Sequence, residues 1–393
     1  MRLRQTTLNA VWNRKPYEVP NKNMPRTMFL YRGIFRIGVV FTVFIITLRW
    51  FILYKAPNES SPWEQNSIDP NYVEIVQKFV SKVLQQECIP SSVKKNMSVL
   101  FSGKYKPYIL PFLTKDTILN DTIFQYFPPF GFNNLQHKLE EILSLFPDLP
   151  KNKVTVEPCK RCVVVGSGGI LRGLELGHLL DQFDVIIRLN NAPVKDFSKD
   201  VGTRTTIRMS YPEGSPKTWD DFDPNILFVA VIYKRVDFNW LKAMVTKEQL
   251  SLFDWIFFWQ EVAGSIPIKP SQFRILNPEI VIQTAMDLLQ LPPPRWKLWG
   301  QDQNVPTLGA IASIMATYLC DEVSLAGFGY DLSQPEAPLH YYENTRMDAM
   351  KSQTMHNVDN ERQFLASLVK AGVIKDLTGG IHCTFCKMKT LQL

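Results

Sequence analysis

Beyond residue 36, the sequence lacks an excess of charge of either sign. The first 36 residues carry eight Lys and Arg against one Glu, and the remaining chain holds 36 basic and 36 acidic residues. A body without net charge has no electrostatic footprint for a polyanion, so nucleic acid is excluded as a partner. The basic excess at the start instead bears on membrane topology.

The sequence also shows no internal repeat. Apolar residues make up 45% of its 393 residues, a share that excludes general disorder and suffices for one large core or two smaller ones. Aromatic residues reach 12%, which indicates either a large core or surfaces that stack on sugars.

An apolar run near the N-terminus predicts a membrane span. Residues 33–54 read GIFRIGVVFTVFIITLRWFILY, which is about the length that a helix needs to cross a bilayer. We expect Arg49 to snorkel toward the far interface, with Trp50 and Tyr54 as interfacial aromatics. A cleaved signal peptide is the alternative. It fits less well, because about thirty residues precede the run and no small-residue cleavage site follows it.

Charges and sequons predict which side of the membrane each part occupies. Basic residues precede the run, whereas Glu59, Glu64 and Asp69 follow it. The positive-inside rule therefore assigns residues 1–32 to a cytoplasmic tail and the body to a lumen, as in a single-pass type II protein. Three N-x-[ST] glycosylation sequons agree with this assignment, because all lie on the lumenal side. They are Asn58, Asn96 and Asn120.

The six cysteines all lie in the predicted lumenal part. Disulfides are the default state of cysteines in a lumen. Two Cys-x-x-Cys pairs leave a zinc site as the alternative, which is weakened by the gap of about 220 residues between the pairs. The cysteines are Cys88, Cys159, Cys162, Cys320, Cys383 and Cys386.

The segment between the span and residue 158 predicts little regular structure. Residues 55–80 are polar with several prolines, and we expect them to form a lumenal stem. A helical apolar pattern runs from Val73 to about Leu84. Residues 81–157 are interpreted as the N-terminal part of the lumenal body, largely irregular structure wrapped on the core. The last residues, 386–393, are assigned to a tail.

Residues 158–385 predict one α/β domain. A strand at 162–165, a glycine loop at 166–169, a helix from about 170 to 181 and a strand at 184–190 make a β-α-β unit. Such units build a Rossmann-like parallel sheet flanked by helices. Further strands are expected at 226–231, 274–276 and 323–326, and further helices near 237–250, 278–290, 309–319 and 359–371.

The glycine loop Gly166-Ser167-Gly168-Gly169 predicts an anion site. Glycines let a ligand approach the backbone, and the N-terminus of the helix expected after the loop would offer N–H groups. The dinucleotide fingerprint fails, because Leu171 occupies the place of its third glycine. The next strand ends at Asn190 instead of the acidic residue that would hold the ribose of NAD, which disfavours a nicotinamide-dependent enzyme. A tight turn without a ligand is the alternative.

A second loop and two histidines add polar groups to this domain. The segment Asn304-Val-Pro-Thr-Leu-Gly309 also opens a predicted helix, so contacts to a phosphate or ribose are expected there. His340 and His356 lie beside acidic residues, and a neutral His in a cleft is a good general base near neutral pH. Purely structural roles are the alternative for both.

Four segments resemble the sialylmotifs of animal sialyltransferases. Residues 162–211 (from CVVVGSGG onward) resemble the large motif and residues 306–331 the small motif. His340-Tyr-Tyr-Glu343 resembles motif III, and His356 with Glu361 resembles the very small motif. The order and spacing are the family's over roughly residues 150–385. The resemblance implies a variant of the GT-A glycosyltransferase fold, a Golgi membrane location with a lumenal catalytic domain, and a CMP-sialic acid donor.

The resemblance also implies roles for individual residues. His356 matches the catalytic base and His340 matches the histidine that contacts the phosphate. The pairs Cys162–Cys320 and Cys88–Cys159 match the family's disulfides. The positions that match donor-binding residues are Ser167, Gly168, Gly169, Asn190, Thr307, Gly309 and Gly329.

We expect no obligatory metal ion and no other cofactor. The string Asp221-Phe-Asp223 matches the D-x-D pair with which other glycosyltransferases hold a divalent cation, but three residues match often by chance. CMP carries a single phosphate, so there is less charge to neutralise than in a nucleoside diphosphate.

The acceptor implied by the resemblance is a galactose-terminated glycolipid. Segments such as 128–132 and 353–358 resemble family members with such acceptors. Aromatic residues between 253 and 259 either face a lipid-bearing acceptor or pack in the core. The alternatives are a sialyltransferase for glycoprotein galactose and a non-catalytic membrane protein that binds the CMP-sugar or the glycan. An oligomer with itself or with other glycosyltransferases is a further expectation. The aromatic residues are Phe253, Trp255, Phe257, Phe258 and Trp259.

Overall fold

The computed structural model divides the chain into two units, residues 1–59 and 60–393. In the first unit, residues 38–47 form a helix with exposed side chains. No helix within the described ranges is long and apolar enough to cross a membrane. The rest of the expected span, Asn58 and Asn120 lie outside the described residues. The described residues are 38–47, 69–114, 121–147, 158–219, 223–294, 304–330, 333–352 and 355–386.

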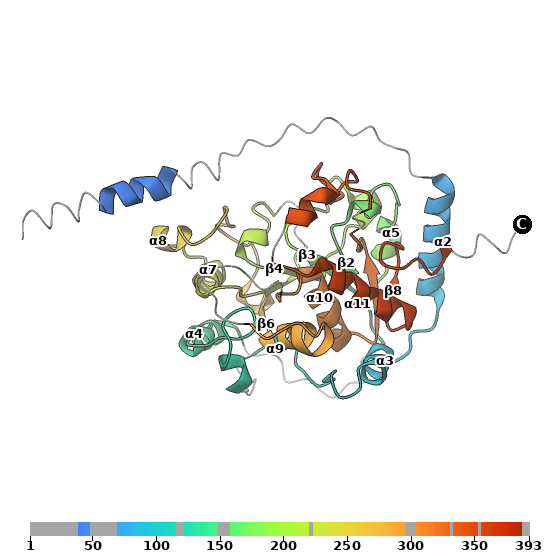
Figure 1. Cartoon of the computed structure of the whole chain (residues 1–393), viewed down its shortest axis with the longest axis horizontal. Helices are drawn as coiled ribbons and strands as arrows, with labels where there is room; N and C mark the ends of the chain where they lie inside the picture. The colour runs from blue at the N-terminus through green and yellow to red at the C-terminus, as the bar shows by residue number, and fades with distance from the viewer. Residues whose placement is uncertain are drawn as a thin grey trace, which may run out of the picture. The chain divides into compact units, whose positions relative to one another are not determined.

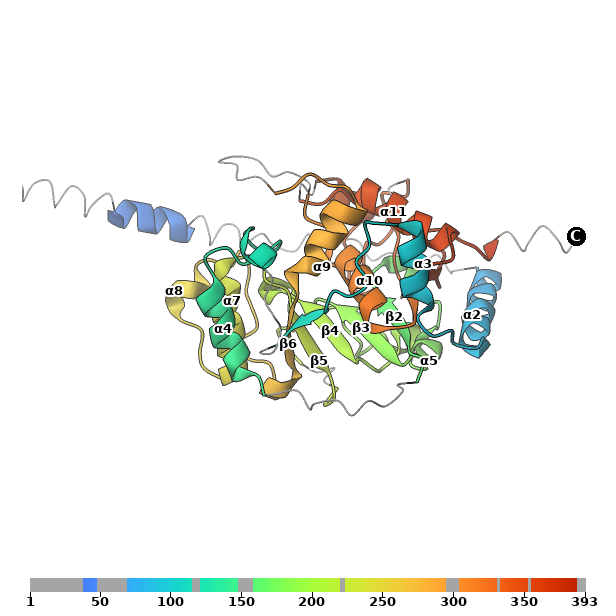
Figure 2. The same ribbon diagram turned by 90° about the horizontal axis from the view of Figure 1, so that it is seen from below.

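The second unit is built on a sheet with the strand order β1-β6-β5-β4-β3-β2-β7-β8 among the described residues (Figure 2). β1 is antiparallel to β6, and all other neighbouring strands are parallel. The chain runs from β2 outward to β6 and returns with β7 on the other side of β2. The strand order therefore reverses between β2 and β7, the place where open α/β sheets bind ligands. The strands are β1 Phe112–Leu113, β2 Arg161–Val165, β3 Val185–Leu189, β4 Ile207–Ser210, β5 Leu227–Ala230, β6 Phe273–Leu276, β7 Glu322–Ala326 and β8 Lys375–Asp376.

Helices cover both faces of this sheet (Figures 1 and 2). In β2, Cys162 and Val164 pack toward α3, α9, α10 and α11, whereas Val163 and Val165 pack toward α2 and α5. Farther along, α4 and α7 cover the second face over β5 and β6. Burial on both faces explains why Cys162–Val165 of β2 and Leu227–Ala230 of β5 are uninterrupted apolar runs. The helices are α2 Pro70–Gln85, α3 Ser92–Leu100, α4 Gln136–Leu145, α5 Gly177–Leu180, α6 Ser198–Val201, α7 Arg235–Thr246, α8 Leu252–Trp255, α9 Pro278–Ile282, α10 Leu308–Leu319 and α11 Val358–Lys370.

Short helical turns and one π-helix lie between these elements in the described residues. They are the 3-10 turns η1 Asp121–Phe124, η2 Gly169–Leu171, η3 Pro212–Gly214, η4 Pro270–Gln272 and η6 Met347–Ser352, and the π-helix η5 Gln283–Leu288. The π-helix continues α9, so the two together occupy the single helix predicted near 278–290. The strands predicted at 162–165, 184–190, 226–231, 274–276 and 323–326 are all present, and the prediction of a sheet flanked by helices is confirmed.

One predicted helix is wrong. The range 170–181 contains the turn η2 and the one-turn helix α5, with a break between them. Gly173 and Glu175 both have positive φ, 76° and 52°, and a right-handed helix cannot pass through such residues. The expected inward residues Leu171, Leu174 and Leu179 are nevertheless buried.

The segment before residue 158 is more regular than expected. It holds α3 and α4 among its described residues, and Leu139, Ile142 and Leu143 form the buried stripe of α4. The sequon residue Asn96 is exposed on α3. The predicted helix near 73–84 is present as α2, whose Val76 and Val80 are fully buried against the body. In our assignment the stem therefore ends near residue 69 instead of at 80.

Disulfides join all six cysteines. Cys162 pairs with Cys320 and Cys88 with Cys159, the two pairs that the resemblance implies. Cys383 pairs with Cys386. The zinc alternative is wrong, because no thiolate is left to bind zinc.

Candidate active site

A cavity of about 1210 Å³ opens where the loops after β2 and β7 meet. The Gly168 amide donates to the Gly327 carbonyl across 3.0 Å, and a Cβ atom at Gly168 would lie 2.5 Å from the same oxygen. Only glycine permits this approach of the two loops. The cavity brings together most of the residues predicted from the sequence. They are Ser167, Gly168, Asn190, Thr307, Gly309, Gly329, His340 and His356.

The glycine loop does not form the predicted helix N-terminus. The amides of Gly166 and Gly169 donate to the backbone carbonyls of Ala326 and Leu339, at 2.8 and 3.1 Å. Gly169 does not line the cavity, and a Cβ atom there would lie 2.3 Å from the Pro338 carbonyl oxygen. These two glycines therefore serve close backbone packing, and the turn η2 follows the loop in place of the expected helix. Binding of an anion at this loop stays a prediction.

His356 lies just before α11 at the wall of the cavity. Its Nδ1 atom is 2.8 Å from the carbonyl oxygen of Val305. A carbonyl can only accept, so Nδ1 carries the hydrogen and Nε2 is the basic atom of the neutral ring. Burial lowers the pKa of His356 below its ordinary value of 6.5, against the opposing effect of the bond to Val305. The imidazole is therefore neutral at neutral pH.

Glu361 ties α11 to the start of α10. Its carboxylate accepts the Thr307 amide at 2.7 Å and the Thr307 hydroxyl at 2.5 Å. Thr307 in turn caps α10 by accepting the Ala310 amide at 3.2 Å. Burial raises the pKa of Glu361 to about 7, although both bonds from Thr307 oppose the change. The link fixes the Val305–Thr307 loop, and so the orientation of His356.

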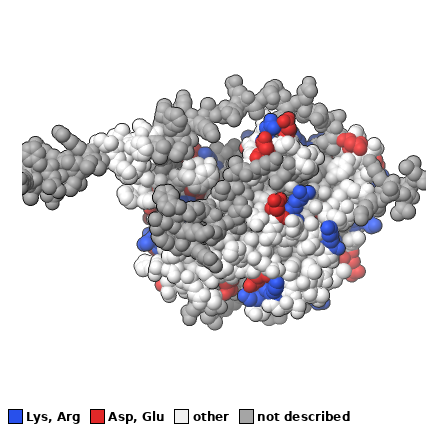
Figure 3. All heavy atoms as spheres, in the orientation of Figure 1, with Lys and Arg blue, Asp and Glu red and all other residues white. Residues whose placement is uncertain are grey.

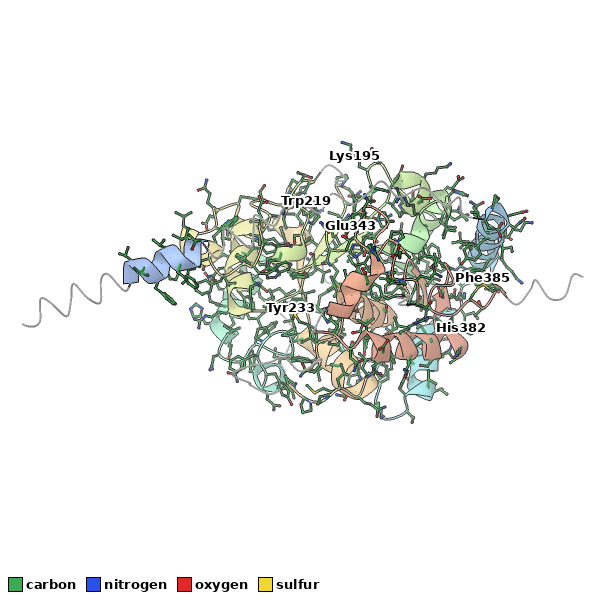
Figure 4. The ribbon with its side chains drawn as sticks, turned by 45° about the horizontal axis from the view of Figure 1, so that its top comes forward. Lys195, Trp219, Tyr233, Glu343, His382 and Phe385 are labelled. Atoms are coloured by element: carbon green, nitrogen blue, oxygen red, sulfur yellow. A yellow bond between two sulfur atoms is a disulfide. The ribbon has the colours of Figure 1, made fainter. Side chains whose placement is uncertain are left out.

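His340 lies on an extended segment that pairs with the glycine loop. It forms an antiparallel bridge with Gly168, and the Tyr341 amide donates to the Ser167 carbonyl at 3.0 Å. The His340 Nδ1 atom is hydrogen-bonded to Glu343, and its ring stacks on Tyr342 with centroids 5.3 Å apart. The bond with His340 lowers the pKa of Glu343. Figure 4 shows Glu343 and Tyr233 toward the middle of the body, and Tyr233 lines the cavity.

Asn190 follows β3 in a left-handed conformation with a φ of 51°. Its side-chain oxygen accepts the Ser210 hydroxyl at 3.2 Å, and its backbone carbonyl accepts from Arg208 at 2.8 Å. A Cβ atom at Gly214 would lie 2.5 Å from Asn190 Oδ1, so a larger residue there would displace the Asn190 side chain. These contacts orient the Asn190 side chain at the cavity.

A buried charge cluster was missed by the sequence reasoning. Lys234 Nζ lies 2.6 Å from Glu213 Oε1 and 3.2 Å from Asp237 Oδ1, and both carboxylates are fully buried. Burial raises the pKa of Asp237 to about 6, and Lys234 opposes that change. Lys234 and Glu213 line the cavity together with Trp259. No local signal reveals the pair, because 21 residues separate its members.

Figure 3 shows Lys, Arg, Asp and Glu scattered over one face without a large patch of a single sign. Within the described ranges, no group of three or more His, Cys, Asp or Glu side chains is placed to hold a metal ion. Asp223 accepts the Asn225 amide at 2.9 Å in a turn and does not line the cavity. Asp221 lies outside the described residues.

The aromatic cluster is mostly exposed. Phe258 alone is buried, whereas Phe253, Phe257 and Trp259 are 72%, 57% and 62% exposed. The interpretation of this segment as a core helix is therefore wrong for these three rings.

The chain is similar to known proteins in sequence and in fold. A family model described as glycosyltransferase family 29 (sialyltransferase) matches residues 112–373. The chain is 49% identical to lactosylceramide alpha-2,3-sialyltransferase of Homo sapiens, over 94% of this chain and 88% of that one. It is 42% identical to CMP-N-acetylneuraminate-beta-1,4-galactoside alpha-2,3-sialyltransferase of Homo sapiens, over 75% and 77%. The crystal structure of a mammalian sialyltransferase matches with a TM-score of 0.59 and 24% identity, over 74% and 97%, a likeness of fold.

Proposed function

Since the chain belongs to glycosyltransferase family 29, the sialyltransferases, we propose that it transfers sialic acid from CMP-sialic acid to lactosylceramide. The terminal galactose is the acceptor, the linkage is alpha-2,3, and the product is the ganglioside GM3. The observation that carries the acceptor is the 49% identity over 94% of the chain to a relative named for this reaction. The 42% identity to the beta-1,4-galactoside enzyme keeps glycoprotein galactose as the second candidate.

His356 is the general base of this proposal. The galactose 3-hydroxyl attacks the anomeric carbon of the donor, the bond from that carbon to the CMP phosphate breaks, and the centre inverts. His356 Nε2 takes the hydroxyl proton as the new bond forms. Two observations support the role: the Nδ1 bond to Val305 fixes the tautomer, and burial keeps the ring neutral.

His340 is the group that stabilises the leaving CMP. Negative charge grows on the phosphate as the glycosidic bond breaks. When protonated, His340 donates from both ring nitrogens, so it can bond Glu343 and a phosphate oxygen together. Ser167, Gly168, Asn190, Thr307, Gly309 and Gly329 complete the donor site in this proposal, because they line the same cavity.

The topology belongs to the proposal as well. Residues 33–54 anchor the chain in the Golgi membrane as a single type II span, with residues 1–32 in the cytosol and the catalytic domain in the lumen. The apolar run and the basic residues before it support this assignment. The reaction needs no obligatory metal ion, which predicts full activity in EDTA. Loss of activity in EDTA that Mn²⁺ restores would contradict it.

An acceptor comparison tests the function. The full chain in detergent is given CMP-sialic acid with lactosylceramide or with an asialo-glycoprotein, and the sialylated products are identified by mass spectrometry. We expect sialyl-lactosylceramide as the preferred product. Preference for the glycoprotein would establish the second candidate, and binding of CMP-sialic acid without transfer to any galactose acceptor would leave a non-catalytic binding protein.

A further inference from the structure

An exposed apolar surface surrounds α8. Among eight consecutive residues, 252–259, five large apolar side chains are more than half exposed. Scattered single residues of this kind are normal on a protein surface, but a contiguous group marks an interaction site. Figures 1 and 2 show α8 at the edge of the body, beside α7 and at the end opposite to α2. We name this group the α8 patch: Leu252 (88% exposed), Phe253 (72%), Ile256 (55%), Phe257 (57%) and Trp259 (62%).

The orientation of the patch is fixed by the other side of the segment. Ser251 caps α8 by accepting the Asp254 amide at 3.1 Å. The Asp254 carboxylate accepts Asn239 of α7 at 2.7 Å, and Phe258 is buried in the core. Asp254 is the one charged residue between 251 and 260, and it faces α7. The outward face of residues 252–259 is therefore apolar and carries no charged side chain.

The patch continues into the candidate active site. Trp259 belongs to the patch and also lines the cavity, and its amide lies 3.4 Å from the buried carboxylate of Glu213. Phe127 lines the cavity too and is 59% exposed. Apolar side chains thus extend from the cavity wall to the outer surface around α8.

We infer that the α8 patch docks on the surface of a lipid bilayer and holds the cavity against it. This inference rests on the proposed function. The sugar of a glycolipid is attached to a ceramide buried in the bilayer, so a short headgroup reaches the cavity only if the cavity comes to the membrane surface. Phe, Trp and Leu side chains without charge are suited to the boundary between headgroups and acyl chains of a neutral membrane.

The test compares a membrane acceptor with a soluble one. The full chain is reconstituted in phosphatidylcholine vesicles that contain lactosylceramide, and its rate is measured on that lipid and on free lactose. The patch variant carries Leu252→Ser, Phe253→Ser and Phe257→Ser. The matched control carries Val99→Ser and Leu110→Ser, which are 80% and 56% exposed elsewhere on the body. We expect the patch variant to lose about tenfold in rate on lactosylceramide, with its rate on lactose and its melting temperature unchanged. The control should match the parent with both acceptors.

A fluorescence measurement tests contact of the α8 patch with the membrane independently of catalysis. In vesicles of brominated phosphatidylcholine, the bromine atoms should quench part of the tryptophan fluorescence of the parent. The Trp259→Phe variant should lack that quenched part. An equal rate of parent and patch variant on lactosylceramide, or no difference in quenching, would overturn the docking. A dimer that the patch variant abolishes, with both rates unchanged, would assign the patch to a second copy of the chain. A parent inactive on both acceptors would refute the proposed function, while the quenching would still decide the membrane contact.

Discussion

The Nδ1 atom of His356 lies 2.8 Å from the Val305 carbonyl oxygen, so the segment before α11 is bonded to the loop that opens α10. Glu361 makes a second link between the same two segments through Thr307. The proposed base thus has a fixed tautomer and a fixed position, which are the two conditions that proton transfer in a transition state requires.

The first prediction concerns the pH dependence of the rate. A general base must be neutral, and burial lowers the pKa of His356, so the ring becomes half protonated only below pH 6.5, its ordinary pKa. The acidic limb of kcat/KM should therefore have its midpoint below pH 6.5. A pH–rate profile with lactosylceramide measures it. A midpoint at or above 6.5 would contradict the assignment.

The second prediction concerns Glu361→Gln. Burial raises the pKa of Glu361 to about 7 from an ordinary 4.5, so between these values the folded chain binds more protons than the unfolded one. The free energy of unfolding should fall as the pH rises through this window, by about 3 kcal/mol in total from this group. Gln does not titrate, so the variant should lose this part of the slope.

Urea unfolding at several pH values measures that slope. Glu74→Gln is the matched control, because Glu74 is an exposed carboxylate on α2. An unchanged slope in Glu361→Gln would show that Glu361 is ionised across the whole range in the folded state.

The third prediction concerns Lys234→Met. The substitution leaves the buried carboxylates of Glu213 and Asp237 without their cation, and breaking such a cluster costs about 3–5 kcal/mol of unfolding free energy. Lys199→Met is the control, since its ion pair with Glu175 is exposed to solvent. Equal effects of the two variants in urea unfolding would contradict a structural role for the buried cluster.

The fourth prediction concerns the close packing of the glycine loop. An added Cβ at Gly169 meets the Pro338 carbonyl at 2.3 Å, so Gly169→Ala should destabilise the fold by on the order of 1–3 kcal/mol. It should also raise the KM for CMP-sialic acid several-fold, because the displaced segment carries His340. Gly264→Ala is the control, as nothing lies within 4 Å of its Cβ position. A normal melting temperature and KM for Gly169→Ala would show that the loop adapts.

The sequence predicted the parts of the fold that local pattern determines. The strands β2, β3 and β7 are rich in apolar residues because they are buried on both faces, and the small residues after β2 and β7 mark loops that approach closely. The helix expected at 170–181 failed because the left-handed conformation of Glu175 is imposed by tertiary contacts, including the Asp200 carboxylate that accepts its amide at 2.9 Å.

Contacts between residues far apart in the sequence could not be predicted from the local sequence pattern. Glu213 and Lys234 meet only when β4 and β5 lie side by side, so neither residue stood out in the sequence. The sequence did not decide whether the aromatic residues near α8 are buried or exposed, since burial depends on what packs against a segment. Their exposure around Trp259 is a result of the fold, and the sequence alone offered two interpretations.

The most direct test of the account is transfer by His356→Ala. The full chain and this variant are compared for CMP-sialic acid binding and for sialyl-lactosylceramide formation under the same conditions. The account predicts that the variant folds, binds the donor with similar affinity and forms product at least about a hundredfold more slowly, the usual contribution of a general base. A folded variant that forms product at the parent's rate would contradict the assignment of His356 as the base and would require another group at the cavity to accept the proton.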